Sequence, residues 1–97
     1  IGEGVAIPHG KIPGLKTIAA AVGKNVQGLK FDSLDNKPCH IFFLLVAPSN
    51  SVSGHLKALA RASMLLKNPA LRESLMNTTS QQELYKVLLE FDDHLDE

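Results

Sequence analysis

Several features that mark common classes of protein are scarce in this sequence. It has a single cysteine, Cys39, which excludes an intramolecular disulfide and a multi-cysteine zinc site. Its 10 lysines and arginines balance 10 aspartates and glutamates, and this gives no support to nucleic-acid binding, which usually needs a basic face. The longest apolar run, Ile41 to Ala47, is far shorter than the roughly 20 residues that span a bilayer. We therefore expect neither a nucleic-acid partner nor direct membrane insertion.

The composition that remains is that of one small globular domain. The chain has 97 residues, of which 44% are hydrophobic and 21% charged, and these values argue against disorder. No repeat, low-complexity segment or linker divides it, so residues 1–97 are expected to form a single domain. No stretch has the pattern of a secretory signal, and we expect a cytoplasmic protein.

The first half of the chain is predicted to form strands and turns. Glycines and prolines surround one short strand at about residues 4–7. Residues 17–23 are predicted to form a buried strand, residues 28–33 a short extended piece, and residues 35–38 a turn. Residues 40–46 are apolar on both faces, which is typical of a strand inside a sheet that helices cover on both sides.

The second half is predicted to form three helices. Ser53 is expected to cap a helix over residues 54–67, with an inward face at helical spacing made of Leu56, Leu59, Ala60, Ser63 and Leu66. Asn68 and Pro69 predict the start of a second helix. Ser80 and Glu83 form a capping box that predicts the third, with Leu84, Val87, Leu88 and Phe91 inward. Strands followed by helices predict a layered α/β or α+β domain.

The acidic end of the chain gives a separate expectation. Residues 92–97 include four acidic side chains, and we expect this segment to be frayed. His94 lies within it and is expected to be solvated.

His9 lies where a predicted strand, a proline and a glycine meet. Functional groups of open sheets gather at strand ends. Gly10 leaves room for the backbone of a partner to approach, and Lys11 adds a positive charge nearby. The alternative is an inert histidine in an exposed turn, since turns use glycine in any case.

His55 lies in the first turn of the first predicted helix. Backbone N–H groups there have no partner within the helix, and they suit an anion. Ser51 and Ser53 could add hydroxyl donors to the same site. The alternative is a solvated histidine beside an ordinary helix cap.

The remaining candidates point to structure rather than chemistry. His40 is expected to be satisfied by a neighbour within the sheet, and it cannot easily pair with Cys39 because adjacent strand residues point to opposite faces. Cys39 is expected to be a small buried residue. The sequence contains no nucleotide-binding loop, serine elbow or zinc-binding helix motif.

Considered together, the two histidine segments resemble those of a known family. The stretch from Ile1 to Ile12, which includes Pro8-His9-Gly10, is similar to the phosphorylation-site segment of enzyme IIA domains of the fructose/mannitol/nitrogen-regulatory class of the bacterial sugar phosphotransferase system. Three further segments follow in the family's order: residues 31–33 with 37–38, a hydrophobic strand ending at Pro48, and residues 55–61. The resemblance covers nearly the whole chain, and its specificity comes from the two histidines in combination.

This resemblance implies a fold and a mechanism. The fold is an α/β three-layer sandwich with a mixed β-sheet flanked by helices on both faces. His9 would accept a phosphoryl group from the histidine-containing phosphocarrier protein and pass it to an enzyme IIB domain, and His55 would stabilise the phosphoryl oxygens. We expect Gly10, Lys11, Ser51 and Ser53 to contribute to the binding site. The family implies no metal and no other cofactor for this phosphotransferase component.

The resemblance also leaves differences and alternatives. Family members have a further N-terminal third with an arginine that helps to hold the phosphate, and neither Arg61 nor Arg72 matches it. Residues 1–97 therefore resemble the C-terminal two-thirds of such a domain, and a homo-oligomer could cover its exposed sheet. One alternative function is a nitrogen-regulatory protein whose phosphorylation state controls binding to regulatory partners. Another is a truncated domain that folds or oligomerises without either function.

Overall fold

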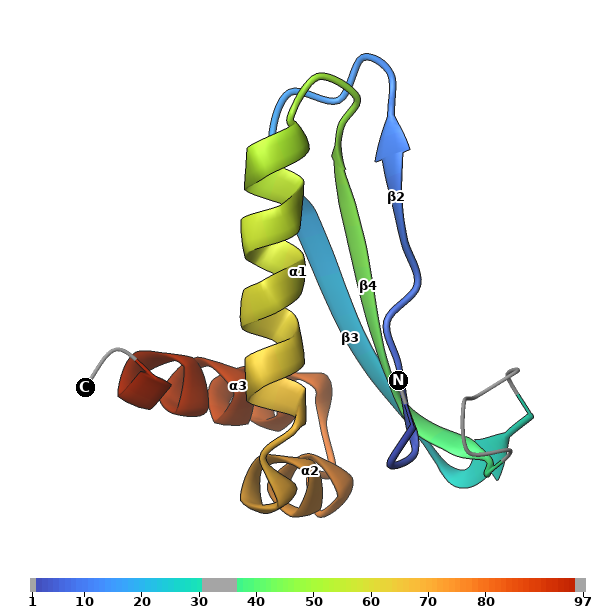
Figure 1. Cartoon of the computed structure of the whole chain (residues 1–97). Coiled ribbons are helices and arrows are strands. Elements are labelled where there is room, and N and C mark those ends of the chain that lie inside the picture. The colour runs from blue at the N-terminus through green and yellow to red at the C-terminus, as the bar shows by residue number, and fades with distance from the viewer. Residues whose placement is uncertain (1, 31–36, 96–97) are drawn as a thin grey trace.

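The computed structural model describes residues 2–30 and 37–95. Four strands precede three helices along the chain (Figure 1). The strands are β1 (Val5–Ala6), β2 (His9–Ile12), β3 (Ala19–Leu29) and β4 (Cys39–Pro48). The helices are α1 (Val52–Leu66), α2 (Pro69–Met76) and α3 (Gln81–Leu95).

Strand β4 is the centre of the sheet, because the other three strands all pair with it. β1 and β2 run parallel to β4 on one side, with His9 opposite Leu45. β3 runs antiparallel to β4, with Val22 opposite Phe43. The sheet is therefore mixed, and the predicted α/β class is confirmed.

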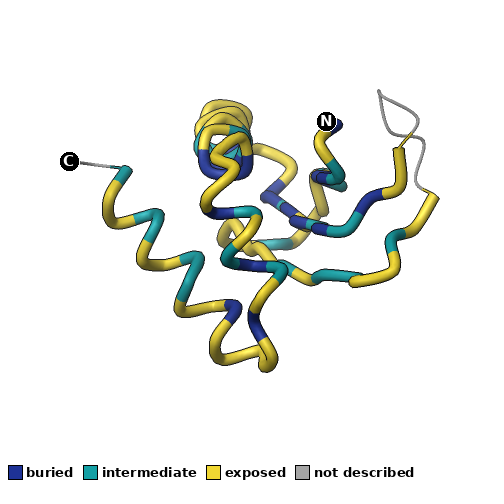
Figure 2. Tube along the Cα trace, turned by 90° about the horizontal axis from the view of Figure 1, so that it is seen from below, coloured by how far each residue is buried: buried dark blue, intermediate teal, exposed yellow. Residues whose placement is uncertain are grey.

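The core lies between the sheet and the helices. Alternate residues of β4 are buried, and Ile41, Phe43 and Leu45 pack with the inward leucines of α1, α2 and α3. Figure 2 shows the three helices on the same side of the strands. On the opposite face Leu44 is 45% exposed. Within the described residues, the helices thus cover one face of the sheet, and no second helical layer is present.

The predicted strands are found in part. The strand expected at residues 4–7 is reduced to β1, and β2 is an additional strand that the sequence did not predict. The strand expected at residues 17–23 forms as β3 but is mostly exposed, so its predicted burial was wrong. The physical reason is that β3 pairs with β4 alone among the described strands and has small alanines at its start. The extended piece expected at residues 28–33 and the turn expected at residues 35–38 fall partly on residues 31–36, which lie outside the described residues.

Helix α1 differs from its prediction in its start and its inward face. The N-cap is Ser51 rather than Ser53, and Ser51 makes no capping hydrogen bond with its side chain. Leu56 is 59% exposed, whereas His55, Ala62, Leu65 and Leu66 are buried. The inward face therefore begins one residue earlier than predicted, because His55 takes the position expected for Leu56.

The other two helices start as predicted. The Asn68 side chain accepts a hydrogen bond from the Ala70 backbone N–H at the start of α2. The Ser80 hydroxyl accepts one from the Glu83 N–H at the start of α3. The expected fraying of residues 92–97 was wrong for residues 92–95, since α3 continues to Leu95 and Asp92 forms an ion pair with Arg61 at 2.6 Å. Residues 96–97 lie outside the described residues.

Candidate functional site

His9 is presented by the first residue of β2. The Pro8 carbonyl accepts a hydrogen bond from the Leu45 N–H at 2.9 Å, which fixes the chain against β4 just before the histidine. The His9 side chain is exposed. It lies beside the C-terminal half of β4, the edge of a sheet where functional groups gather in open α/β folds.

One nitrogen of the His9 ring is already engaged. Nδ1 lies 2.7 Å from the backbone carbonyl oxygen of Ile7. A carbonyl can only accept a hydrogen bond, so Nδ1 carries the proton in this arrangement. In the neutral ring the lone pair is then on Nε2, and Nε2 is the nitrogen available as a nucleophile. No sequence pattern indicates this bond, which depends on how the chain turns around Pro8.

His55 brings a second imidazole to the same place from α1. It lies in the first turn of the helix, on the inward face, and is only 7% exposed. The centroids of the His9 and His55 rings are 5.6 Å apart, with an angle of 44° between the ring planes. The structure thus brings together the two histidines that the sequence singled out, one exposed and one buried.

The buried ring has an unsatisfied atom. Within the described residues, Nδ1 of His55 has no hydrogen-bond partner and almost no solvent exposure. A buried polar atom without a partner costs about 1–3 kcal/mol, and such atoms in native structures call for an explanation. A site that receives a charged group only during function provides one.

The four expected binding residues lie on the two segments that present these histidines. Gly10 and Lys11 follow His9 in β2, and Lys11 shares the strand face of His9 because side chains alternate. Ser51 is the N-cap of α1, and Ser53 is exposed in its first turn. A Cβ on Gly10 would meet no atom within 4 Å, so the face of β2 opposite to His9 is open at this residue.

Gly54 has a packing reason to be glycine. A Cβ at this position would lie 2.6 Å from Ser51 Oγ and 3.4 Å from Ile18 Cδ1. The turn before β3 therefore packs directly against the first turn of α1. This contact joins the β2–β3 connection to the helix that presents His55.

The other titratable candidates are separate from this site. The ring of His40 is hydrogen-bonded through Nδ1 to the Asn25 carbonyl at 3.1 Å, which confirms the expected structural role. Cys39 is fully buried, as expected. His94 is exposed near the end of α3.

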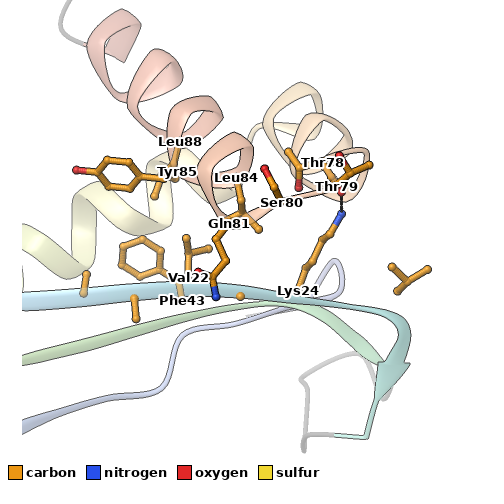
Figure 3. Close-up of a pocket in the computed structure, with 14 residues that line it drawn as sticks. Val22, Lys24, Phe43, Thr78, Thr79, Ser80, Gln81, Leu84, Tyr85 and Leu88 are labelled. Carbon is orange, nitrogen blue, oxygen red and sulfur yellow. Dashed lines mark hydrogen bonds between the residues drawn. The ribbon is translucent and has the colours of Figure 1, made fainter.

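A cavity of about 720 Å³ lies elsewhere, between β3 and the start of α3 (Figure 3). Val22, Phe43 and Leu84 form its apolar walls. Lys24 does not point into its centre, because its Nζ donates to the carbonyls of Met76 and Thr78. No histidine lines this cavity, so we assign the candidate site to the histidine pair.

Two features are absent from the described residues. No helix there is long and apolar enough to cross a membrane. In residues 2–30 and 37–95, no group of three or more histidines, cysteines or acidic residues is arranged to hold a metal ion.

The fold and its paired histidines fit the class of phosphotransferase components, and comparison with known proteins identifies the family. The family described as "Phosphoenolpyruvate-dependent sugar phosphotransferase system, EIIA 2" matches residues 1–91. The chain therefore belongs to this family, and the resemblance found in the sequence is confirmed.

Named relatives fall into two groups. A nitrogen regulatory protein of Bradyrhizobium diazoefficiens is 40% identical over 91% of this chain and 58% of its own length. The fructose-specific EIIABC component of Bacillus subtilis is 35% identical over 95% of this chain and 14% of its own length. The crystal structure of a nitrogen regulatory protein IIA-Ntr from Neisseria meningitidis superposes with a TM-score of 0.82 and 36% identity, over 90% of this chain and 60% of that one. This chain thus spans about three-fifths of the length of the regulatory relatives.

Proposed function

We propose that this chain is a phosphohistidine carrier in which Nε2 of His9 accepts the phosphoryl group. The donor is the histidine-containing phosphocarrier protein, and the receiver is an enzyme IIB domain or a regulatory protein. The main support is the hydrogen bond from His9 Nδ1 to the Ile7 carbonyl, since it leaves Nε2 as the free nucleophile on an exposed ring. These partners also imply a cytoplasmic site of action.

The transfer needs no atom beyond the two proteins. The Nε2 lone pair of His9 attacks the phosphorus of the donor's phosphohistidine, a new P–N bond forms, and the P–N bond to the donor breaks with its electron pair returning to the donor ring. The His9 ring gains positive charge as the bond forms. Its Nδ1–H bond to the Ile7 carbonyl becomes charge-assisted and therefore stronger at that moment.

His55 and the start of α1 would stabilise the transferred group. Phosphoryl transfer depends mainly on positioning and on stabilising charge spread over the phosphoryl oxygens. The start of α1 offers N–H groups that have no partner within the helix, and the buried His55 ring, whose centroid is 5.6 Å from that of His9, lies in the same turn. Lys11, Ser51 and Ser53 are the further groups that we assign to this role.

The second candidate is regulation rather than sugar transport. Its support is that the relative from Bradyrhizobium and the solved structure from Neisseria both bear a nitrogen-regulatory name. The acceptor chemistry would be the same, but the phosphorylated and unphosphorylated forms would bind different proteins. Pull-down of a regulatory protein by only one of the two forms, with no transfer to any IIB domain, would favour this candidate.

A phosphorylation assay tests the shared chemistry. The full chain is incubated with phosphoenolpyruvate, the kinase of the system and the phosphocarrier protein, and acid-labile phosphate is measured. We expect one phosphate on the wild type, none on His9→Ala, and an unchanged amount on His94→Ala, a control at the other end of the chain. Unchanged labelling of His9→Ala would reject the proposed acceptor.

A further inference from the structure

Strand β3 has one edge with which no other described strand pairs. Within residues 2–30 and 37–95 its partner is β4, and β1 and β2 pair with the other side of β4. Figure 1 shows β2 and β3 on opposite sides of β4. Alternate residues of an antiparallel strand direct their backbone N–H and C=O groups away from the partner strand. The outer edge of β3 therefore presents a row of backbone donors and acceptors at the border of the sheet.

The part of this edge that can accept another strand is regular. Ala19 to Lys24 pair with β4 residue by residue, and the register shifts only after Lys24. Beyond that point the Asn25 side chain accepts hydrogen bonds from the backbone N–H groups of Gln27 and Gly28, which bends the chain locally. Residues 19–24 span about 20 Å at the rise of a β-strand. We call this segment the β3 edge.

The β3 edge lacks the features that usually keep an edge strand from pairing. Natural edges are blunted by proline, by outward charges, by bulges or by a covering element. Residues 19–24 contain no proline and no acidic residue, and their one charged residue is Lys24. Its Nζ donates to the carbonyls of Met76 and Thr78, so its charge is directed toward the helices and not along the edge (Figure 3).

Both faces of the sheet beside this edge are apolar. Val22 lies opposite Phe43 and packs against the core, whereas Ala21 lies opposite Leu44 on the uncovered face. On the helix side the edge borders the cavity of about 720 Å³, and Val26, which also lines this cavity, is 70% exposed. A strand added to the β3 edge would extend the sheet and cover apolar surface on both of its faces.

We propose that the β3 edge pairs with the β3 edge of a second copy of this chain, antiparallel about a two-fold axis at Ala21. A two-fold axis perpendicular to the sheet relates two identical edges as an antiparallel pair, in which each strand makes the same contacts as the other. An axis at Ala21 sets Val22 opposite Ala20 of the second copy, and Ala19 opposite Gly23. The zero net charge of the chain gives no general repulsion between copies.

Self-pairing suits this particular sequence. The side chains that meet across the axis are alanine, valine and glycine, which are small enough for two backbones to approach. No two charged side chains are placed opposite each other within residues 19–23. β2, which presents His9, lies on the other side of β4, so this dimer leaves the histidine pair accessible. The inference does not depend on the proposed function.

Cross-linking at the axis locates the contact. Directly opposite residues of antiparallel strands have Cβ atoms about 4.5–5.5 Å apart, so Ala21→Cys places two thiols side by side. We expect a short bismaleimide to join two copies of this variant in high yield. Lys86→Cys, on the exposed surface of α3, is the control and is expected to give little linked dimer. Cys39 is buried and present in both variants.

Sedimentation equilibrium measures the association of the unmodified chain over a concentration series that reaches the millimolar range. We expect the wild type to dimerise. Ala21→Glu is expected to raise the dissociation constant about tenfold or more, because two carboxylates would meet at the axis. Gln27→Glu adds the same charge to β3 beyond the regular segment, and it is expected to change the constant less than about twofold. Thermal unfolding verifies that each variant is folded.

Each outcome supports or rejects the pairing. A wild type that stays monomeric throughout the series would reject it. A dimer that survives Ala21→Glu but is lost in Leu44→Glu would place the contact on the uncovered sheet face and reject the pairing of edges. Cross-linking that is as efficient through Lys86→Cys would also reject it. Phosphorylation of His9 is expected to be equal in the wild type and Ala21→Glu, and its absence from both would reject the proposed function alone.

Discussion

The exposed imidazole of His9 lies beside the buried imidazole of His55, with the ring centroids 5.6 Å apart. The two rings reach this position from a strand and a helix that both pack on β4. Their unequal exposure supports the different roles that we propose for them. His9 is exposed, whereas His55 is 7% exposed and packs on the inward face of α1.

Substitution of His55 is expected to slow transfer without moving the acceptor. We expect His55→Ala to reduce the rate of phosphorylation about 100-fold, the typical effect of removing one preorganised donor, while the phosphate remains on His9. His55→Gln keeps most of the volume and an amide donor, and its loss should be smaller. Rapid-quench measurement of phosphorylation checks both variants. A phosphate found on His55 of the wild type would contradict the assignment.

Gly28 is expected to tolerate alanine poorly. Its φ is +85°, and a Cβ there would lie 2.8 Å from Cε1 of His40 and 2.9 Å from Cβ of Pro38. The steric conflict and the left-handed backbone together should lower the free energy of unfolding of Gly28→Ala by about 3 kcal/mol. Gly14→Ala is the control, because φ at Gly14 is +83° with open space around it, and it should cost only about 1–2 kcal/mol. Urea unfolding measures both, and equal losses would show that the contact with His40 is unimportant.

The start of α3 is expected to weaken in acid. The backbone N–H of Thr79, and then its hydroxyl, donate to the Glu83 carboxylate and lower its pKa below the ordinary value of 4.5. A lowered pKa in the folded state means that the carboxylate stabilises the fold fully above pH 4.5 and that this contribution is lost as the pH falls through the folded pKa. Unfolding of the wild type and Glu83→Gln is therefore compared from pH 6 to pH 3. The two should differ at pH 6 and converge toward pH 3, and a constant difference would argue against this origin.

The sequence predicted the parts of the fold that depend on local signals. The caps at Asn68 and Ser80 were found because a side chain near in sequence satisfies a helix N–H. The exposure of β3 was not found, because it depends on which faces the rest of the chain covers. His55 was predicted to be a site residue, and its burial was not predicted, because histidine is not counted in an apolar pattern although it occupies a core position of α1.

The candidate site could be predicted only to the level of residue identity. Proline and glycine around His9 indicated a special segment, and the resemblance linked it to His55. The bond between His9 Nδ1 and the Ile7 carbonyl, which selects Nε2, follows from the path of the backbone around Pro8 and has no counterpart in the sequence pattern.

The central claim is that His9 is the acceptor and that Nε2 is the reacting atom. The most direct test is heteronuclear NMR of the phosphorylated, ¹⁵N-labelled chain, in which coupling between phosphorus and a ring nitrogen identifies the bonded atom. We predict coupling to Nε2 of His9, with Nδ1 still protonated and donating its hydrogen bond to the Ile7 carbonyl. Coupling to Nδ1 of His9, or to either nitrogen of His55, would contradict the account.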